Sequence, residues 1–128
     1  MQKKSVNTII QNSKGKYLLQ MRDSAPNICN PLKWNFFGGG MKETNPLLGA
    51  IREMREELGI VADKEDLVLV GKIEKLNSSK VYIVQYKKKV NWGEFTLHEG
   101  AGAGYFTKEE IMKIESTDNA KLIVQSYL

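Results

Sequence analysis

Residues 49–60, GAIREMREELGI, limit how this chain can fold more than any other segment. Each residue of an α-helix advances about 100° around the axis. On that geometry Glu53, Glu56 and Glu57 share an arc of roughly 100°. The apolar residues fall on the adjoining side: Leu47, Ala50, Ile51, Met54 and Leu58. We therefore expect a helix that packs one face on a core and turns the next, acidic, face elsewhere.

The acidic arc has two interpretations. A solvated surface face is common on charged helices, and Arg52 precedes Glu56 by one turn, where it offsets part of the repulsion. A divalent-cation site is the alternative, because Mg²⁺ takes oxygen ligands and needs few carboxylates beside phosphate oxygens. Glycines at 38–40 and in the loop after Glu99 let the backbone approach an ion or phosphate closely. Glycines alone are weak evidence, since surface loops share that composition.

These segments resemble the signature of the Nudix hydrolases, also called the MutT-type family. That signature reads G-x5-E-x7-R-E-U-x-E-E-x-G-U, in which U is a bulky aliphatic residue. Residues 52–60, REMREELGI, match its second half at every fixed position, and residues 34–40, WNFFGGG, resemble the usual approach to it. The first half departs: Thr44 stands where the family has glutamate, Lys42 stands where members often have another, and Glu43 is the nearest carboxylate.

The resemblance implies a fold and a reaction. The fold is of the α/β (α+β) class, with a mixed β-sheet sandwiched between helices (α/β/α), in a single domain over residues 1–128. The reaction is Mg²⁺-dependent hydrolysis, with Mn²⁺ as a possible substitute, of a nucleoside diphosphate linked to another group. The substrate we favour is a (deoxy)nucleoside triphosphate, which would yield a monophosphate and pyrophosphate.

The resemblance also assigns roles to residues. Glu56 and Glu57 are the leading metal ligands, with Glu53 as ligand or base, the Gly38 carbonyl as a further ligand, and Arg52 orienting the carboxylates. Glu99 is either a metal ligand or general base, or a surface charge of its loop. The proposed substrate contacts each have a structural alternative: surface ion pairing for Arg22, core packing for Trp34 and Phe36, and helix capping for Asn119.

Three further features of the sequence each have a functional and a structural interpretation. Tyr82 could stack on a base, although aromatic residues in strands usually pack in the core. His98 neighbours Glu99, yet a lone histidine is more often a surface or packing residue, and we favour that interpretation. The run Lys87–Lys89 is most simply a soluble strand end.

Composition restricts the setting of the chain. It has 128 residues, 41% of them hydrophobic, which is enough for one domain with its own core. The net charge of +4 suits an anionic phosphate ligand without requiring nucleic acid. Cys29 has no partner for a disulfide, which indicates a cytoplasmic setting, and no segment is apolar enough to span a membrane. The sequence does not distinguish a monomer from a homodimer.

The secondary structure expected from the pattern is mixed. Strands are predicted at 6–11, 16–22, 67–76, 80–89 and 103–106, and the segment from 23 to 34 is expected to be a loop. The acidic helix should begin near Pro46 and end at Leu58, before Gly59. Thr107 and Glu110 form a capping box for a helix to about Ile114, and Thr117 or Asp118 should cap a last helix to Tyr127.

Three functional hypotheses therefore remain. The first is a Nudix pyrophosphohydrolase. The second is a Nudix-fold module that binds a nucleotide without cleaving it, suggested by Lys42 and Thr44. The third is an interaction domain that binds RNA through Lys87–Lys89, which is the least favoured.

Overall fold

A computed structural model describes residues 3–22, 32–98 and 100–128. Its strands are β1 (Lys4–Ile9), β2 (Tyr17–Met21), β3 (Trp34–Gly40), β4 (Leu67–Glu74), β5 (Lys80–Tyr86) and β6 (Gly102–Phe106). They form one sheet in the order β4-β5-β1-β3-β2-β6. Only β1 and β5 run parallel; the other neighbouring pairs are antiparallel. The sheet is therefore mixed, as expected.

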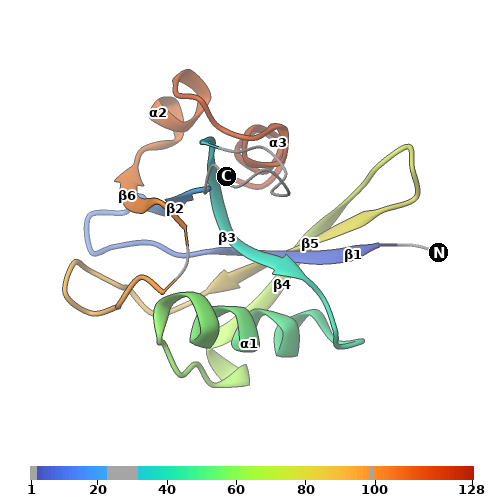
Figure 1. Cartoon of the computed structure of the whole chain (residues 1–128), viewed down its shortest axis with the longest axis horizontal. Helices are drawn as coiled ribbons and strands as arrows, with labels where there is room; N and C mark the ends of the chain where they lie inside the picture. Colours follow the sequence, from blue (N-terminus) through green and yellow to red (C-terminus); the bar gives the residue numbers. More distant parts are fainter. Residues whose placement is uncertain (1–2, 23–31, 99) are drawn as a thin grey trace.

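Helices cover both faces of this sheet. The helical elements are α1 (Pro46–Leu58), the short 3₁₀ turn η1 (Lys64–Asp66), α2 (Lys108–Lys113) and α3 (Asp118–Tyr127). Figure 1 shows α1 on one side of the sheet and α2 and α3 on the other. This arrangement confirms the expected α/β/α layering.

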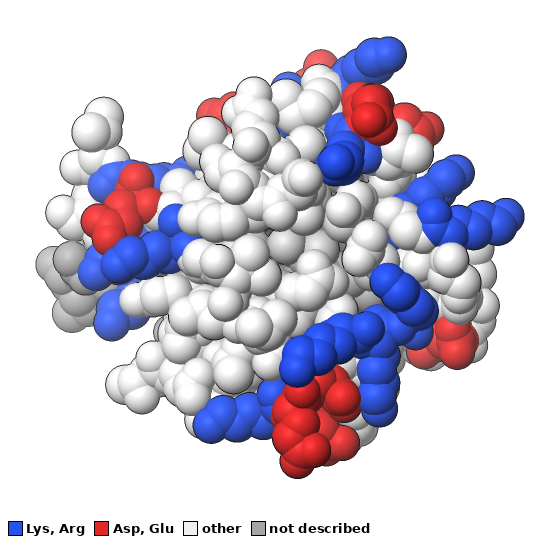
Figure 2. Space-filling model, turned by 180° about the vertical axis from the view of Figure 1, so that it is seen from behind, with Lys and Arg blue, Asp and Glu red and all other residues white. Residues whose placement is uncertain are grey.

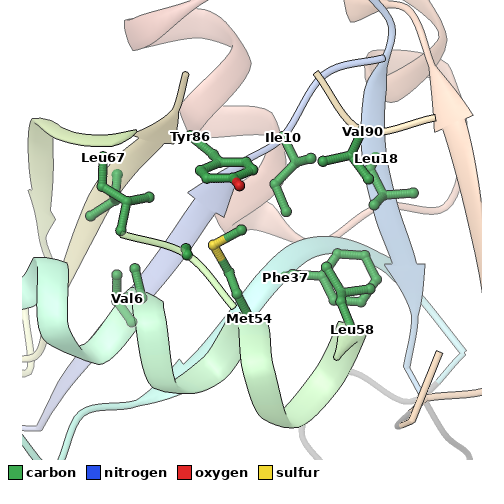
Figure 3. Close-up of a cluster of buried hydrophobic side chains, with 12 residues drawn as sticks. Val6, Ile10, Leu18, Phe37, Met54, Leu58, Leu67, Tyr86 and Val90 are labelled. Atoms are coloured by element: carbon green, nitrogen blue, oxygen red, sulfur yellow. The ribbon is translucent and has the colours of Figure 1, made fainter. Parts of the chain in front are cut away.

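Each face of the sheet carries its own hydrophobic core. On the α1 side, Phe37 from β3 packs with Met54 and Leu58 from the helix (Figure 3). On the other side, Ile9 and Phe36 pack with residues of α2 and α3, including Ile111 and Ile123. Because side chains alternate along a strand, β3 supplies Phe36 to one core and Phe37 to the other. The glycines that follow are thereby held at a fixed place at the end of the sheet.

The ends of α1 are set by local sequence. Asn45 accepts a hydrogen bond from the Leu47 amide at 2.9 Å, and Pro46 occupies the first turn, where no amide hydrogen is needed. At the other end Gly59 adopts a left-handed conformation with φ of 68° and donates its amide to the Arg55 carbonyl at 3.0 Å. The predicted start at Pro46 and end at Leu58 are confirmed.

Most other predicted elements are present with shifted ends. The capping box of Thr107 and Glu110 is confirmed, and Thr117 caps α3. The main error is β3, which was not predicted as a strand, because three of its residues are glycines, which are depleted in strands. The strand predicted through Lys89 ends at Tyr86, and Lys87–Lys89 follow it as exposed residues.

One edge of the sheet is the strand β4. Val68, Leu69 and Val70 are exposed there, and Leu122 of α3 is exposed as well. Seen from behind, the molecule has a broad uncharged centre with its charged side chains gathered at the margins (Figure 2). Among the described residues, no helix combines the length and the apolar character that crossing a bilayer requires.

Candidate active site

The acidic face of α1 lines a cleft of about 620 Å³ at one end of the sheet. The glycine segment of β3 forms a second wall, and the end of β2 and the loop before β6 supply the remainder. The lining residues are Gln20, Arg22, Gly38, Gly39, Gly40, Lys42, Arg52, Glu53, Glu56, Glu57, His98 and Gly100. The acidic arc is therefore not a plain solvated face, because it borders a cavity that four basic or imidazole residues and four glycines also line.

Arg52 links the groups of this cleft. Its Nη1 donates to Glu53 Oε1 at 2.9 Å and to Glu56 Oε2 at 3.2 Å. Its Nη2 donates to the Gly40 carbonyl at 2.9 Å, which ties α1 to the end of β3. A guanidinium presents its donors in a rigid planar fork, so these contacts fix the directions of the carboxylates as well as their distances. Arg52 is therefore placed where it can orient Glu53 and Glu56, and its role in the reaction stays a prediction.

Glu43 completes the set around Arg52. Arg52 Nε donates to Glu43 Oε2 at 2.7 Å, and the Lys42 amide donates to Glu43 Oε1 at 3.0 Å. The Arg52 guanidinium holds the pKa of the Glu43 carboxyl below its ordinary value. Thr44, by contrast, is exposed. Glu43 therefore places a carboxylate on Arg52, next to the signature position that Thr44 occupies.

Glu53 is buried against the glycine segment. Only 8% of it is exposed, and a Cβ added to Gly39 would lie 2.9 Å from Glu53 Oε1. The absence of a side chain at Gly39 therefore lets the carboxylate approach the β3 backbone. Burial raises the pKa of Glu53, and the charge of Arg52 opposes that rise.

Glu57 is the most buried carboxylate of the cleft, with 3% exposed. Gln20 of β2, itself buried, donates its side-chain amide to Glu57 Oε2 at 3.3 Å. Sequence reasoning did not single out Gln20, because its contact with Glu57 crosses from a strand to a helix far along the chain. Its place in the middle of an otherwise apolar strand is the one signal that could have pointed to it.

Gly38 is required by the packing of β3 on β1. Its φ is +152°, and a Cβ there would lie 1.8 Å from the Val6 carbonyl oxygen. Any side chain would therefore force the two strands apart. The glycine places its backbone, a candidate metal ligand, along the wall of the cleft opposite the glutamates.

The donor set fits a magnesium ion that arrives with a phosphate chain. Carboxylates and backbone carbonyls are hard oxygen donors, as Mg²⁺ requires. Within the described residues, no three acidic, histidine or cysteine side chains already stand close enough to form a complete cage. Mg²⁺ seldom uses one, because it is bound through one or two carboxylates and substrate phosphates. Glu56, whose side chain is 46% exposed, is the ligand candidate most open to the cleft.

Other candidates differ in where the structure places them. Arg22 lines the cleft, and its contact with a phosphate stays a prediction. His98 packs on Gly59, as a packing residue would, but it also lines the cleft, and its Nδ1 lies 3.2 Å from the Glu56 carbonyl oxygen. Cys29 and Glu99 lie outside the described residues.

The aromatic residues proposed to contact substrate are not in the cleft. Phe36 has no exposed surface, so it cannot stack on a base without opening the core. Trp34 packs edge-on against Phe106, with ring centroids 4.8 Å apart, and neither it nor Phe36 lines the cleft. Tyr82 is packed against the α1-side core. For all three, the structural alternative of core packing is the one observed.

Asn119 lies in a neighbouring hollow of about 540 Å³ on the α3 side of the sheet. Its Oδ1 is buried and has no hydrogen-bond partner among the described residues. Capping therefore does not account for its side chain, because Thr117 accepts the capping hydrogen bond from Ala120 at 3.1 Å instead. Asn119 remains available to a ligand that reaches past Gly40, which borders both cavities.

The positive charge of the run Lys87–Lys89 is partly neutralised. Lys88 pairs with Asp66 at 3.3 Å, and Lys87 donates to the Glu65 carbonyl at 3.0 Å. These contacts tie Lys87 and Lys88 to η1, so the run is a less open nucleic-acid surface than its sequence suggests.

Comparison with solved structures shows the same fold in proteins of low sequence identity. A MutT from work on Aliivibrio salmonicida and Vibrio cholerae superposes with a TM-score of 0.78 at 17% identity, covering 98% of this chain and 95% of that one. The MutT protein of Methanosarcina mazei gives 0.71 at 25% identity, with 94% and 88% covered. The NUDIX domain of Shewanella oneidensis NrtR, in complex with ADP-ribose, gives 0.73 at 10% identity, with 98% and 85% covered.

The sequence itself decides the family. No curated protein matches it, but the family model described as the NUDIX domain matches residues 1–124. The intact glutamate motif on α1 and the layered mixed sheet agree with that match. The chain therefore belongs to the NUDIX family and is a Nudix hydrolase.

Proposed function

We propose that the chain is a Mg²⁺-dependent pyrophosphohydrolase that cleaves a nucleoside diphosphate linked to another group. The substrate we favour is a (deoxy)nucleoside triphosphate, converted to a monophosphate and pyrophosphate. The observation that carries the proposal is the convergence of Glu53, Glu56 and Glu57 with Arg52 on one cleft walled by the backbone of Gly38–Gly40.

The residues have separate roles in this proposal. Glu56 and Glu57 would hold Mg²⁺, with Glu53 and the Gly38 carbonyl as further candidates. Bound Mg²⁺ supplies charge neutralisation at the phosphates and lowers the pKa of water. Arg52 and Gln20 keep the carboxylates oriented, and Arg22 and Lys42 add positive charge where the phosphates would lie. Glu99 remains a proposed ligand or general base from its place in the sequence.

The nucleoside is proposed to extend over Gly40 toward Asn119. The unpartnered Oδ1 of Asn119 can accept a hydrogen bond from a base or a ribose. Polar groups of this kind orient a ligand within a mostly preformed pocket.

The test is the substitution Glu57→Gln, which keeps the shape of the side chain and removes its charge. We expect turnover to fall at least about a hundredfold, as when one preorganised charge is lost from a reaction centre. The matched control is Glu109→Gln on α2, an exposed residue, which should leave turnover unchanged. Both variants should melt cooperatively near the parent. An unchanged rate in folded Glu57→Gln would remove the proposal.

A substrate panel with Mg²⁺ separates hydrolysis from simple binding. It should include nucleoside triphosphates, oxidised purine triphosphates and ADP-ribose, with release of pyrophosphate or phosphate as the measurement. The non-catalytic alternative rested on Lys42 and Thr44. Glu43 weakens that case, because it supplies the carboxylate on Arg52 that Thr44 does not. Tight binding of a nucleotide with no product from any member of the panel would restore the alternative.

A further inference from the structure

Three lysines line the hollow that holds Asn119. Lys4 is the first residue of β1 and Lys3 precedes it, and Lys75 lies at the turn between β4 and β5. We call this cavity the lysine hollow and define it by Lys3, Lys4, Lys75, Asn77, Ser79 and Asn119. Its volume of about 540 Å³ is within the range of small-molecule sites.

The charge of the lysine hollow is uncompensated. No aspartate or glutamate is among its lining residues. Across residues 3–22, 32–98 and 100–128, the ion pairs involve other cations, and none includes Lys3, Lys4 or Lys75. Glu74, the acidic residue next to Lys75 in sequence, is paired with Lys72 at 2.9 Å. The three lysines that line the hollow therefore take no part in the ion pairs of the described residues.

The backbone that carries these lysines is held by strand pairing. The Lys80 amide donates to the Lys3 carbonyl at 2.9 Å, and the Met41 amide donates to the Lys4 carbonyl at 2.8 Å. The Lys75 amide donates to the Ser79 carbonyl at 2.9 Å, which closes the hairpin turn. The backbone positions of the three lysines are thus fixed by hydrogen bonds.

Protection of a sheet edge does not explain Lys3 and Lys4. Lysines often blunt exposed edge strands, but the edges of this sheet are β4 and β6. β1 is an internal strand with β5 on one side and β3 on the other. Their positive charge therefore has no role in preventing edge pairing.

The lysine hollow adjoins the acidic cleft at one residue. Gly40 lines both cavities, and its carbonyl accepts a hydrogen bond from Arg52 Nη2 at 2.9 Å. A ligand with its diphosphate beside the glutamates can therefore pass over Gly40 and place its next group among the lysines.

We propose that the lysine hollow binds a phosphate monoester that the substrate carries one sugar away from the diphosphate that is cleaved. An uncharged nucleoside needs no cations, whereas a phosphate monoester carries nearly two negative charges at neutral pH and is well matched by lysine ammonium groups. The inference rests on the proposed function for the position of the diphosphate. It names the substrate class as nucleotides with an additional phosphate on the ribose or on the linked group.

The experiment measures binding without metal, so hydrolysis is not required. In EDTA, calorimetry compares two matched pairs: adenosine 3′,5′-bisphosphate against AMP, and ADP-ribose 1″-phosphate against ADP-ribose. The guanine forms of the first pair guard against a base preference. We expect the phosphate-bearing member of one pair to bind about tenfold tighter, the effect of one well-made charged contact. The first pair reports a ribose phosphate and the second a phosphate on the linked group.

Matched variants localise that preference. Lys3→Gln/Lys4→Gln/Lys75→Gln should bind both members of the responding pair equally. The control Lys87→Gln/Lys88→Gln/Lys89→Gln removes the same charge elsewhere and should keep the tenfold preference. The inference is overturned if neither pair separates in the parent protein, or if both variants lose the preference equally. Failure to hydrolyse the substrate panel would count against the proposed function alone, because this measurement needs no turnover.

Discussion

Arg52 contacts three carboxylates and a backbone carbonyl, so the cleft depends on one guanidinium being held in place. Glu43 provides that hold through the 2.7 Å contact with Nε. The remaining donors of Arg52 are directed at Glu53, Glu56 and the Gly40 carbonyl. A substitution at Glu43 should therefore alter the carboxylates of α1 indirectly, through Arg52, and not through a contact with the substrate.

Glu43→Gln tests this indirect role. Losing the charge-assisted hydrogen bond should let Arg52 turn, and we expect kcat to fall about tenfold with a smaller change in KM. Thr44→Ala, at the exposed neighbouring position, is the control and should keep the parent kcat. A normal kcat for Glu43→Gln, together with a raised kcat for Thr44→Glu, would show that the signature position still matters and Glu43 does not.

We predict that a side chain at Gly39 lowers kcat by displacing a glutamate of the cleft. In Gly39→Ala the new methyl group would lie 2.9 Å from Glu53 Oε1, so that carboxylate must move. We expect kcat to fall about tenfold or more, because displacements of this size at a reaction centre are costly. Gly102→Ala, where a Cβ would meet nothing within 4 Å, should be close to neutral. Steady-state kinetics and thermal melts of both variants separate lost activity from lost stability.

Among the residues of the cleft, the sequence predicted contacts within one helix and missed contacts between distant segments. Glu53, Glu56, Glu57 and Arg52 lie within six residues of each other, so helical geometry alone places them on one face. Gln20 reaches the same cleft from β2, a partnership that depends on the whole sheet. Phe36 was wrongly considered for stacking because alternation along β3, which decides its burial, was not predicted.

Among the elements, the helices were predictable because their ends carry chemical signals. Asn45, Pro46 and Gly59 bound α1 by hydrogen bonds and backbone preference within the segment itself. β3 has no such local signal, because its glycines have poor strand propensity. It forms a strand because it pairs with β1 and β2, which is a contact between distant segments. The strand most important to the cleft was therefore the one hardest to predict.

β4 and α3 meet at a glycine that tolerates no side chain. A Cβ on Gly71 would lie 2.3 Å from Tyr127 Cε1, and the Tyr127 hydroxyl donates to the Lys72 carbonyl at 2.7 Å. Gly71→Ala should therefore lower the free energy of unfolding by about 1–3 kcal/mol, as overpacking does. In a Tyr127→Ala background the same change should cost much less, and urea unfolding of the double-mutant cycle measures that coupling. Equal costs in the two backgrounds would show that the ring is not what excludes the side chain.

The whole molecule should become more stable when its cleft is filled. A ligand that binds only the folded state stabilises it by about 2.7 kcal/mol at a concentration one hundred times its Kd. We expect Mg²⁺ with a non-hydrolysable nucleotide to raise the melting temperature by several degrees, and either component alone to do less. Glu56→Gln/Glu57→Gln should lose the increase that depends on Mg²⁺. An identical increase with and without the metal would contradict the assignment of these ligands.

Parallel pairing of β1 with β5 has a consequence for how the protein is made. During synthesis β1 leaves the ribosome before β2, β3, α1 and β4, whereas β5, its partner on one side, emerges only after them. Contacts so distant along the chain form slowly, because a long loop must close before they contribute. The nascent domain therefore cannot complete its central sheet until β5 has been synthesised, and we expect chaperones to bind it mainly during that interval.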